Sequence, residues 1–222
     1  MNPTLRRAGA HVLVDDVTRP TLDDAAGHHL FRVLRIGDGE TVTVTDGAGH
    51  WRSCRARAGT IEPDGEMAFV PRRAEPITVA VAIPKQDRPE WLVQKLTELG
   101  VDSVVFCHAE RSVVRWDADR AGKHLAKLRT VAEAALQQSR GVWLPDIAGP
   151  RSVRDVLPGA AAAEPGGRPL AVTDRVVAIG PEGGWSPAEL ELAAATVTLG
   201  DTVLRVETAA VAAAARLVVG RA

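Results

Sequence analysis

The chain has 222 residues, of which 45% are hydrophobic, and a formal net charge of −1 at pH 7. This length suffices for one large domain or two modest ones, and so small a net charge excludes a global electrostatic field that draws the chain to nucleic acid or acidic membranes. The two cysteines, Cys54 and Cys107, lie far apart without the spacing of a metal site, so we expect a reducing compartment, no disulfide framework and no metal. The N-terminus carries no apolar signal segment and no apolar run approaches the length of a membrane span, which predicts a soluble cytoplasmic protein with no membrane partner.

Short extended-type runs follow one another from His11 to about Pro71. Glycine-containing turns at 37–39, 46–49 and 63–65 separate these runs. Short strands at this spacing are typical of a small closed or nearly closed β-barrel.

A short helix is predicted between the first two of these runs. It would place Leu30, Val33 and Leu34 on one side, with Arg32 and Arg35 elsewhere.

A third run, which begins near Trp51, alternates so that Arg55 and Arg57 lie on the same face of a strand. A strand face that points to solvent and a face that contacts RNA explain this pair of arginines equally well.

The residue pattern changes around 72–76 from short extended runs to longer strand and helix patterns, and we place a domain boundary there. Residues 1–73 form the predicted barrel, and residues 74–222 form a second domain. In the second domain, buried-type strands at 77–85 and 101–108 are separated by an amphipathic helix. This β-α-β rhythm predicts an α/β fold with a parallel sheet.

Two further helices are expected in the second domain. The stretch 117–140 is the longest helical segment and has an apolar stripe. The stretch 209–219 is almost entirely Ala, Val and Leu. A helix that is apolar all round is normally buried, here against a partner subunit.

The segment 156–169 is typical of a linker, and PLAV (169–172) is typical of a strand. Only 173–175 then separates this strand from the next one, at 176–180. Neighbouring parallel strands need a crossover of about ten or more residues. Either the connecting loop is deleted, or residues are missing from the sequence, and we favour missing residues.

A tight loop, Pro181–Gly184, follows the strand at 176–180 and precedes a helix. Ser186 is the predicted N-cap of that helix, Pro187 its first residue, and Glu189 completes a capping box. Strand, glycine loop and capped helix together bring backbone N–H groups to a small ligand in α/β proteins.

The ligand of this loop is not expected to be a phosphate, because neither common phosphate-binding glycine pattern is present. In addition, Glu182 would repel a phosphate by about 4 kcal/mol at roughly 4 Å in an effective dielectric near 20. A cationic ligand, or a neutral one with hydrogen-bonding edges, is more compatible, and S-adenosylmethionine (SAM) is one such ligand. A loop that only turns the chain and caps the helix explains the residues equally well.

Two C-terminal motifs carry a resemblance to a known family. The pair IGPEGGWSPAELE (179–191) and LGDTVLRVETA (199–209) resembles the signature of the SPOUT methyltransferases. More narrowly, the chain resembles the bacterial 16S ribosomal RNA uridine-N3 methyltransferases, the RsmE family. Four upstream motifs also match in order: HHLFRVLRIGDGE, KQDRPEWLVQKLTELGV, ERSVV, and Gln138-Ser139-Arg140 with Pro145.

The resemblance implies a PUA-like, RNA-binding barrel over 1–73 and a SPOUT domain over 74–222. It implies a trefoil knot in the parallel-sheet domain, a homodimer, and SAM-dependent methylation of uridine N3 in 16S ribosomal RNA of the small subunit. A SPOUT enzyme that acts on another RNA or another base atom is an alternative. A relative that binds RNA without turnover is a second alternative.

The same resemblance implies site residues. Arg205 and Arg111 are the catalytic candidates, because a cation beside the uracil stabilises charge that builds on O2, O4 or N3. Glu207 caps the last helix or orients Arg205. The RNA-binding candidates are Arg32, Arg35, Arg55, Arg57 and Arg140. The expected cofactor contacts are Ala171, Val172, Ile179, Gly180, Pro181, Glu182, Gly183, Gly184, Leu199, Gly200, Val203, Leu204, Arg205, Glu207, Thr208 and Ala209.

Departures from the family pattern weaken one of these assignments. Gln137 and Gly141 stand where relatives often carry a glutamate and an arginine, so RNA contacts at this helix end are less secure. His108 is the nearest histidine to the cofactor motifs, but a structural role is favoured over a role as general base.

Overall fold

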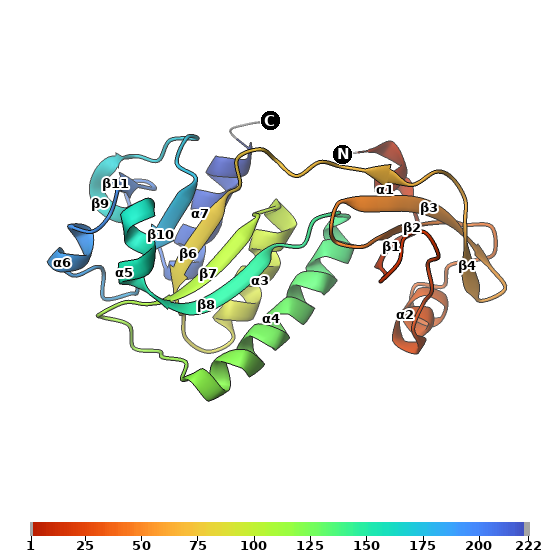
Figure 1. Ribbon diagram of the computed structural model, residues 1–222, viewed down its shortest axis with the longest axis horizontal. Helices are drawn as coiled ribbons and strands as arrows, with labels where there is room; N and C mark the ends of the chain where they lie inside the picture. Colours follow the sequence, from red (N-terminus) through yellow and green to blue (C-terminus); the bar gives the residue numbers. More distant parts are fainter. Residues whose placement is uncertain (1, 220–222) are drawn as a thin grey trace. The chain divides into compact units, whose positions relative to one another are not determined.

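The computed structural model describes residues 2–219 (Figure 1). The chain divides into two compact units. Residues up to Arg73, together with Glu133–Leu144, form the first unit. Ala74–Ala132 and the residues from Pro145 onward form the second. No helix in the described part of the chain is long and apolar enough to cross a membrane.

The first unit is built on one five-stranded sheet with the order β1-β2-β3-β4, and β5 pairs with β3. β1 runs parallel to β2, and the other pairs are antiparallel. Val42 and Val44 of β2 are fully buried and pack with Leu30 and Cys54 in the core of this unit. The elements are α1 (Pro3–Arg7), β1 (Ala10–Leu13), α2 (Asp24–His28), the π-helical turn η1 (His29–Val33), β2 (Thr41–Thr45), β3 (His50–Arg57), β4 (Thr60–Pro63) and β5 (Ala68–Phe69).

The helix predicted before β2 is present, but its apolar side is not the expected one. Leu30 is buried, whereas Val33 is 56% exposed and Leu34 46% exposed. The reason is the π-helical turn, in which the Leu34 N–H donates to the His29 carbonyl. A turn of this width rotates the last residues away from the face that a 3.6-residue period predicts.

The second unit is a six-stranded sheet with the order β11-β9-β10-β6-β7-β8, and every pairing in it is parallel. The predicted parallel α/β sheet is therefore confirmed. The elements are β6 (Thr78–Ala82), α3 (Arg88–Leu99), β7 (Ser103–His108), β8 (Asp146–Ser152), α5 (Val153–Val156), the 3-10 turn η2 (Leu157–Gly159), β9 (Ala161–Pro169), β10 (Val176–Ile179), α6 (Pro187–Leu190), β11 (Ala195–Thr198) and α7 (Val206–Val219), while α4 (Ala118–Ser139) contributes residues to both units.

Helices and turns cover this sheet. Alternate residues of the central strands, such as Ala80 and Ala178, form a buried cluster with Leu157 of η2 and with Trp185. α7 packs against α3 and also contacts β6 and β10. The buried side of α7 is made largely of alanines, which allow the close approach of a helix to a sheet.

The strand before β10 was wrongly located by the sequence pattern. β9 begins at Ala161, inside the segment interpreted as a linker, and Ala161–Ala163 pair with β10. Residues 164–175 then connect these paired residues to β10, which is long enough for a parallel crossover. The connection as it stands in the sequence therefore suffices to join these two parallel strands.

The pairing of β9 with β11 is interrupted by a shift in register, so β9 lacks the regular pattern of a strand. Along β11, the partner of Thr196 is Ala162, but the partner of Val197 is Arg168, so the intervening residues leave the ladder. The ladder resumes at Arg168, and at Gly167 just before it a Cβ atom would lie 2.6 Å from the backbone of Thr196 and Val197. Glycine is required at this close approach of two strands.

Candidate functional site

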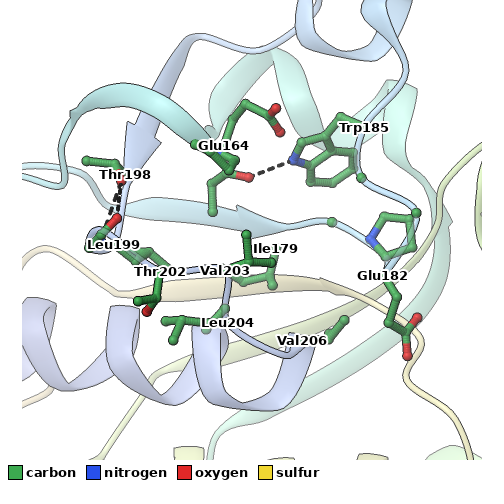
Figure 2. A pocket seen from close by; sticks show the side chains of 18 residues that line it. Glu164, Ile179, Glu182, Trp185, Thr198, Leu199, Thr202, Val203, Leu204 and Val206 are labelled. Atoms are coloured by element: carbon green, nitrogen blue, oxygen red, sulfur yellow. Dashed lines mark hydrogen bonds between the residues drawn. The ribbon is translucent and has the colours of Figure 1, made fainter.

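A cavity of about 370 Å³ lies at the carboxyl ends of β10 and β11 and beside the first residues of α7. This is the edge of a parallel sheet at which α/β proteins bind ligands. Figure 2 shows Glu182 at one end of the cavity, Thr198 and Leu199 at the other, and Ile179 between them. The lining residues are Ala163, Glu164, Pro165, Ile179, Gly180, Pro181, Glu182, Gly183, Gly184, Trp185, Thr198, Leu199, Gly200, Thr202, Val203, Leu204, Val206 and Ala209.

The loop after β10 is held by its own turn and by Trp185. The Gly184 N–H donates to the Pro181 carbonyl at 2.8 Å, and Gly184 has a φ of 71°, which favours glycine. The Trp185 Nε1–H donates to the Ala163 carbonyl at 3.1 Å and so ties the loop to β9 (Figure 2). A Cβ atom at Gly180 would lie 2.9 Å from the Trp185 ring, so this packing needs glycine there.

The predicted capping box is confirmed, and it also anchors a neighbouring segment. Glu189 Oε2 accepts a hydrogen bond from the Ser186 N–H at 2.9 Å, and the Ser186 side chain accepts one from the Glu189 N–H. The other carboxylate oxygen, Oε1, accepts from the Glu110 N–H at 2.8 Å. Glu189 is only 3% exposed, so these donors satisfy a buried charge.

Arg111 holds the same loop from the other side. Its Nη1 donates to the carbonyls of Gly183 at 3.1 Å and Trp185 at 3.0 Å. The segment that contains Glu110 and Arg111 therefore fixes the shape of the loop at both of its ends. This guanidinium is engaged with the backbone of the loop.

Arg88 links the loop after β10 to α7. Its Nη1 lies 3.7 Å from Glu182 Oε1, and its Nε lies 3.6 Å from Glu207 Oε1. The second oxygen of Glu207 is buried without a hydrogen-bond partner among the described residues. Glu207 thus pairs with Arg88, which neither of its two expected roles included.

The loop between β11 and α7 completes the cavity. Thr198 Oγ1 donates to the Gly200 carbonyl at 3.0 Å, which turns the chain where β11 ends. Val203 is 88% exposed, and Arg205 is also exposed. The Arg205 carbonyl accepts from the Ala209 N–H at 2.8 Å, so Arg205 stands at the start of α7.

Comparisons with known proteins agree with this geometry. A family model described as RNA methyltransferase domain matches residues 71–218, and one described as RNA methyltransferase PUA domain matches residues 22–55. The chain is 32% identical over 217 residues to the ribosomal RNA small subunit methyltransferase E of Mycobacterium tuberculosis, covering 86% of this chain and 83% of that protein. The chain belongs to the ribosomal RNA small subunit methyltransferase E family.

Solved structures of similar proteins share the fold of this family member. The ribosomal RNA small subunit methyltransferase E of Neisseria gonorrhoeae, solved bound to S-adenosyl methionine, has a TM-score of 0.78 and 26% identity, covering 94% of this chain and 96% of that one. A probable rRNA-methyltransferase of Porphyromonas gingivalis has a TM-score of 0.78 and 28% identity, covering 96% of this chain and 100% of that one.

The structure brings most of the expected cofactor residues of this methyltransferase-family chain to one cavity. Arg205, Glu207 and Thr208 lie in the same segment but outside the lining. The expected residues that line the cavity are Ile179, Gly180, Pro181, Glu182, Gly183, Gly184, Leu199, Gly200, Val203, Leu204 and Ala209.

Ala171 and Val172 are not at the cavity, because they follow β9 in a turn that closes on Asp174. Their expected place is taken by Ala163, Glu164 and Pro165. The reason is that β9 begins at Ala161, within the segment that the sequence pattern predicted to be a linker. Three further lining residues, Trp185, Thr198 and Thr202, were not predicted, although they adjoin the recognised motifs or lie within them.

Among the described residues, no group of three or more His, Cys, Asp or Glu side chains is arranged to hold a metal ion.

His108 has a structural role. Its Nε2 accepts a hydrogen bond from the Trp116 N–H at 3.1 Å, which requires a neutral ring with that nitrogen unprotonated. Burial, and secondarily the nearby charge of Arg115, lower the pKa of His108. The nitrogen that faces Trp116 is therefore not available to take a proton from a substrate.

The arginines of the first unit fall into two groups. Arg55 donates to the Asp64 carboxylate at 2.9 Å through Nε, and Arg57 Nη1 lies 3.2 Å from Glu62 Oε2. These pairs favour the solvated strand face over the RNA-contact face. In contrast, Arg32 and Arg35 are exposed beside the apolar side chains that η1 turns outward.

Arg140 lies within the first unit and contacts its N-terminal helix. Its Nη1 donates to the Leu5 carbonyl at 3.0 Å, and its φ of 58° places its backbone in the left-handed region.

Proposed function

We propose that this chain transfers the methyl group of SAM to N3 of a uridine in 16S ribosomal RNA of the small subunit. The observation that carries the proposal is the single cavity formed by the GPEGG loop and the LRVETA segment. It occupies the ligand-binding edge of a parallel sheet, in a chain whose relatives include a structure solved with S-adenosyl methionine.

The residues of the cavity fit this cofactor. The volume of about 370 Å³ lies within the usual range of small-molecule sites. Ile179, Leu199 and Leu204 supply apolar walls of the kind that cover an adenine ring. Glu164 and Glu182 supply negative charge suited to a ligand that carries sulfonium and ammonium groups.

The bound cofactor would supply an electrophilic methyl group. The protein's own task is then to hold the loops in place and to accept the charge that develops on the uracil. Arg111 and Glu189 perform the first task through their contacts with the loop after β10. We infer that Arg205, exposed between the cavity residues Leu204 and Val206, performs the second by placing a cation beside the uracil.

We also infer a trefoil knot, a homodimer, a cytoplasmic location and RNA contacts from Arg32, Arg35 and Arg140, with a domain boundary at 73/74. The chain returns from the edge strand β11 past β9 and β10 to pack α7 against β6, a path compatible with a knot. Val113 and Val203 are 74% and 88% exposed, and a partner subunit would remove both side chains from water.

Transfer of a labelled methyl group into small ribosomal subunits that lack the modification tests the proposal. We expect incorporation, and 3-methyluridine in the nucleoside digest by mass spectrometry. Label in a different nucleoside would replace the proposed target atom by another one. Tight SAM binding without any incorporation would instead assign the chain to RNA binding without turnover.

A further inference from the structure

A second cavity, of about 360 Å³, lies within the first unit and shares no lining residue with the cofactor site. Its walls come from residues 9–12, from the helical segment of α2 and η1, and from the last turns of α4 together with Arg140. Apolar side chains such as Val12, Leu30 and Ala134 form much of the lining. The volume lies within the usual range of small-molecule sites.

The opening of this cavity leaves apolar side chains in water. Leu34 lines the cavity and is 46% exposed, and Val33 beside it is 56% exposed. Ala134 of α4 also lines the cavity and is exposed. The π-helical turn η1, which turns Val33 and Leu34 outward, belongs to a rare class of turn that is frequent at functional sites. Adjacent apolar side chains in water indicate a surface that a ligand covers.

Three polar side chains of the lining have capacity for further hydrogen bonds. Gln138 and His29 are exposed, and their side chains form no hydrogen bond with any described residue. Arg140 donates through Nη1 to the Leu5 carbonyl at 3.0 Å, and its other N–H groups donate to no described residue. An amide, an imidazole and part of a guanidinium are therefore available to a ligand.

Two other polar residues of the lining are already engaged with the protein. His11 Nε2 contacts the Gly141 carbonyl at 2.8 Å. Gln137 Oε1 accepts a hydrogen bond from the Leu13 N–H at 3.3 Å. These contacts join β1 to the end of α4 and fix the shape of the cavity, so the side chains that remain for a ligand stand on a rigid frame.

The cations of this surface have no counter-charge of their own. Arg140, Arg32 and Arg35 form no ion pair with any residue that the structure describes. Arg35 directly follows the lining residue Leu34, and Arg32 lies in the same helical segment. Arg35 and Arg140 also have left-handed backbones, with φ of 57° and 58°, a strained conformation of the kind that concentrates at binding sites.

These features together match a nucleotide. A nucleobase has apolar faces that suit the walls of the cavity and a polar edge that suits Gln138 or His29. Its phosphate suits an arginine without a counter-charge. Proteins recognise single-stranded RNA in this way, with unstacked bases held against side chains and phosphates on cations.

We propose that this cavity binds one unpaired nucleotide of the RNA substrate, with the base against the apolar walls, its edge hydrogen-bonded to Gln138 and a phosphate held by Arg140. The inference rests on the proposed function for the identity of the ligand as RNA. It adds a nucleotide-recognition site in the first unit, separate from the residues that line the cofactor cavity.

Ala134→Trp tests the site by covering it with a large side chain at an exposed position of α4. Binding of short single-stranded RNA of random sequence to the full-length protein is measured by fluorescence anisotropy. We expect the affinity to fall roughly tenfold, the value of one stacked base. The slope of log affinity against log salt concentration should stay the same, because no phosphate contact is removed.

Two results of this measurement would overturn the proposal. One is an RNA affinity of Ala134→Trp within twofold of the wild type. The other is no saturable binding of the RNA to the wild type at roughly 1 mM, which is weaker than the usual range of non-specific nucleic-acid binding.

Ala126→Trp is the matched control, because Ala126 is exposed on the same helix and does not line the cavity. It should bind the RNA as tightly as the wild type does. The same loss of affinity in both variants would assign the effect to a change in α4 and contradict the proposed site.

Arg140→Gln separates the phosphate contact from the base contact. The variant should bind RNA more weakly and with a salt slope that is shallower by roughly 0.7, as expected for one phosphate contact in a single strand. Arg57→Gln is its control, since Arg57 is exposed and already pairs with Glu62 at 3.2 Å, and its slope should not change. Equal changes of slope in the two variants would make the effect one of net charge and contradict the role of Arg140.

Crosslinking locates the RNA on the wild-type protein without any substitution. Short RNA that carries 4-thiouridine should crosslink under ultraviolet light to peptides that contain 29–34 or 134–140. Crosslinks confined to other segments would contradict the site. The SAM affinity of Ala134→Trp should equal that of the wild type, because Ala134 lies outside the cofactor cavity. If the wild type transfers no methyl group, the proposed function fails, while RNA affinity and crosslinks still decide this site.

Discussion

Single residues of the cofactor loop act through close contacts. Gly183 is the clearest case, because a Cβ atom there would lie 3.3 Å from Arg111 Cβ. Arg111 in turn donates to the Gly183 carbonyl. Any side chain at this position would therefore crowd Arg111, and a branched one would displace it.

We predict that Gly183→Val weakens SAM binding at least tenfold, because two further methyl groups displace Arg111 and reshape the loop. Isothermal calorimetry measures the affinity. Gly159→Ala is the control, since a Cβ atom at Gly159 meets nothing within 4 Å. SAM affinity of Gly183→Val within twofold of the wild type would remove this loop from the site.

Arg205 and Arg111 should differ in the kinetic step that they affect. Arg205→Ala is expected to lower turnover tenfold or more with SAM affinity nearly unchanged, because its cation acts on charge in the transition state. Arg111→Ala should lower SAM affinity as well, because the carbonyls of Gly183 and Trp185 lose their donor. Equal losses of affinity in both variants would make Arg205 a cofactor ligand instead.

His11 predicts a pH dependence of stability in the first unit. Its Nδ1 contacts Thr43 Oγ1 and its Nε2 contacts the Gly141 carbonyl, each at 2.8 Å. Burial lowers the pKa of His11 to about 4. The unfolded chain takes up a proton near pH 6.5 and the folded chain only near 4, so stability is retained above pH 6.5 and lost as the pH falls toward 4.

Denaturant unfolding at pH 7 and pH 4.5 should therefore show a loss of about 2–3 kcal/mol that depends on His11. His11→Gln should reduce this pH-dependent loss, although it lowers stability at pH 7. An unchanged pH dependence in the variant would show that other groups cause it.

At the scale of elements, the short helix α6 is held by tertiary contacts. Its four residues are far too few for a stable isolated helix. The Glu189 carboxylate joins the start of α6 to the segment after β7 by accepting from the Ser186 and Glu110 N–H groups. One side chain therefore caps a helix and fixes a neighbouring loop.

We predict that Glu189→Ala lowers the free energy of unfolding by about 2–4 kcal/mol, because the backbone N–H groups of Ser186 and Glu110 lose their acceptor. Urea denaturation measures this change. Glu191→Ala is the control, since Glu191 is exposed on the same segment and should change stability by less than about 0.5 kcal/mol. A similar small effect at Glu189 would mean that water replaces the carboxylate.

At the scale of the whole molecule, α7 is the element that most needs its surroundings. It is rich in alanine and valine, and its buried residues face α3 and the sheet. Val211, Ala212 and Ala215 on its other side remain partly accessible in the single chain. This distribution favours a second subunit over α7.

We predict that the chain in solution has twice the mass of one 23.5 kDa chain, as measured by light scattering or sedimentation. Its melting temperature should rise with protein concentration, because association stabilises the folded state by mass action. A single-chain mass at concentrations of tens of micromolar would contradict the homodimer.

The sequence by itself determined the fold class, the capped helix after the GPEGG loop and the motifs that meet at the cavity. These features are local, because capping, turn chemistry and hydrophobic periodicity act over a few residues. For the same reason, residues that adjoin recognised motifs, such as Trp185 and Thr202, could have been found from the sequence.

Only the tertiary structure decided the features that depend on distant partners. The sequence did not predict β9 because its alanines and glycines have weak strand propensity. Gly167 is nevertheless suited to the strand, because it allows the close approach of β11. The pairing of Arg88 with Glu207, and the engagement of Arg111 with loop carbonyls, join residues far apart in the chain. No local pattern predicts such pairs, because the charge of a residue does not indicate which distant residue the fold will place next to it.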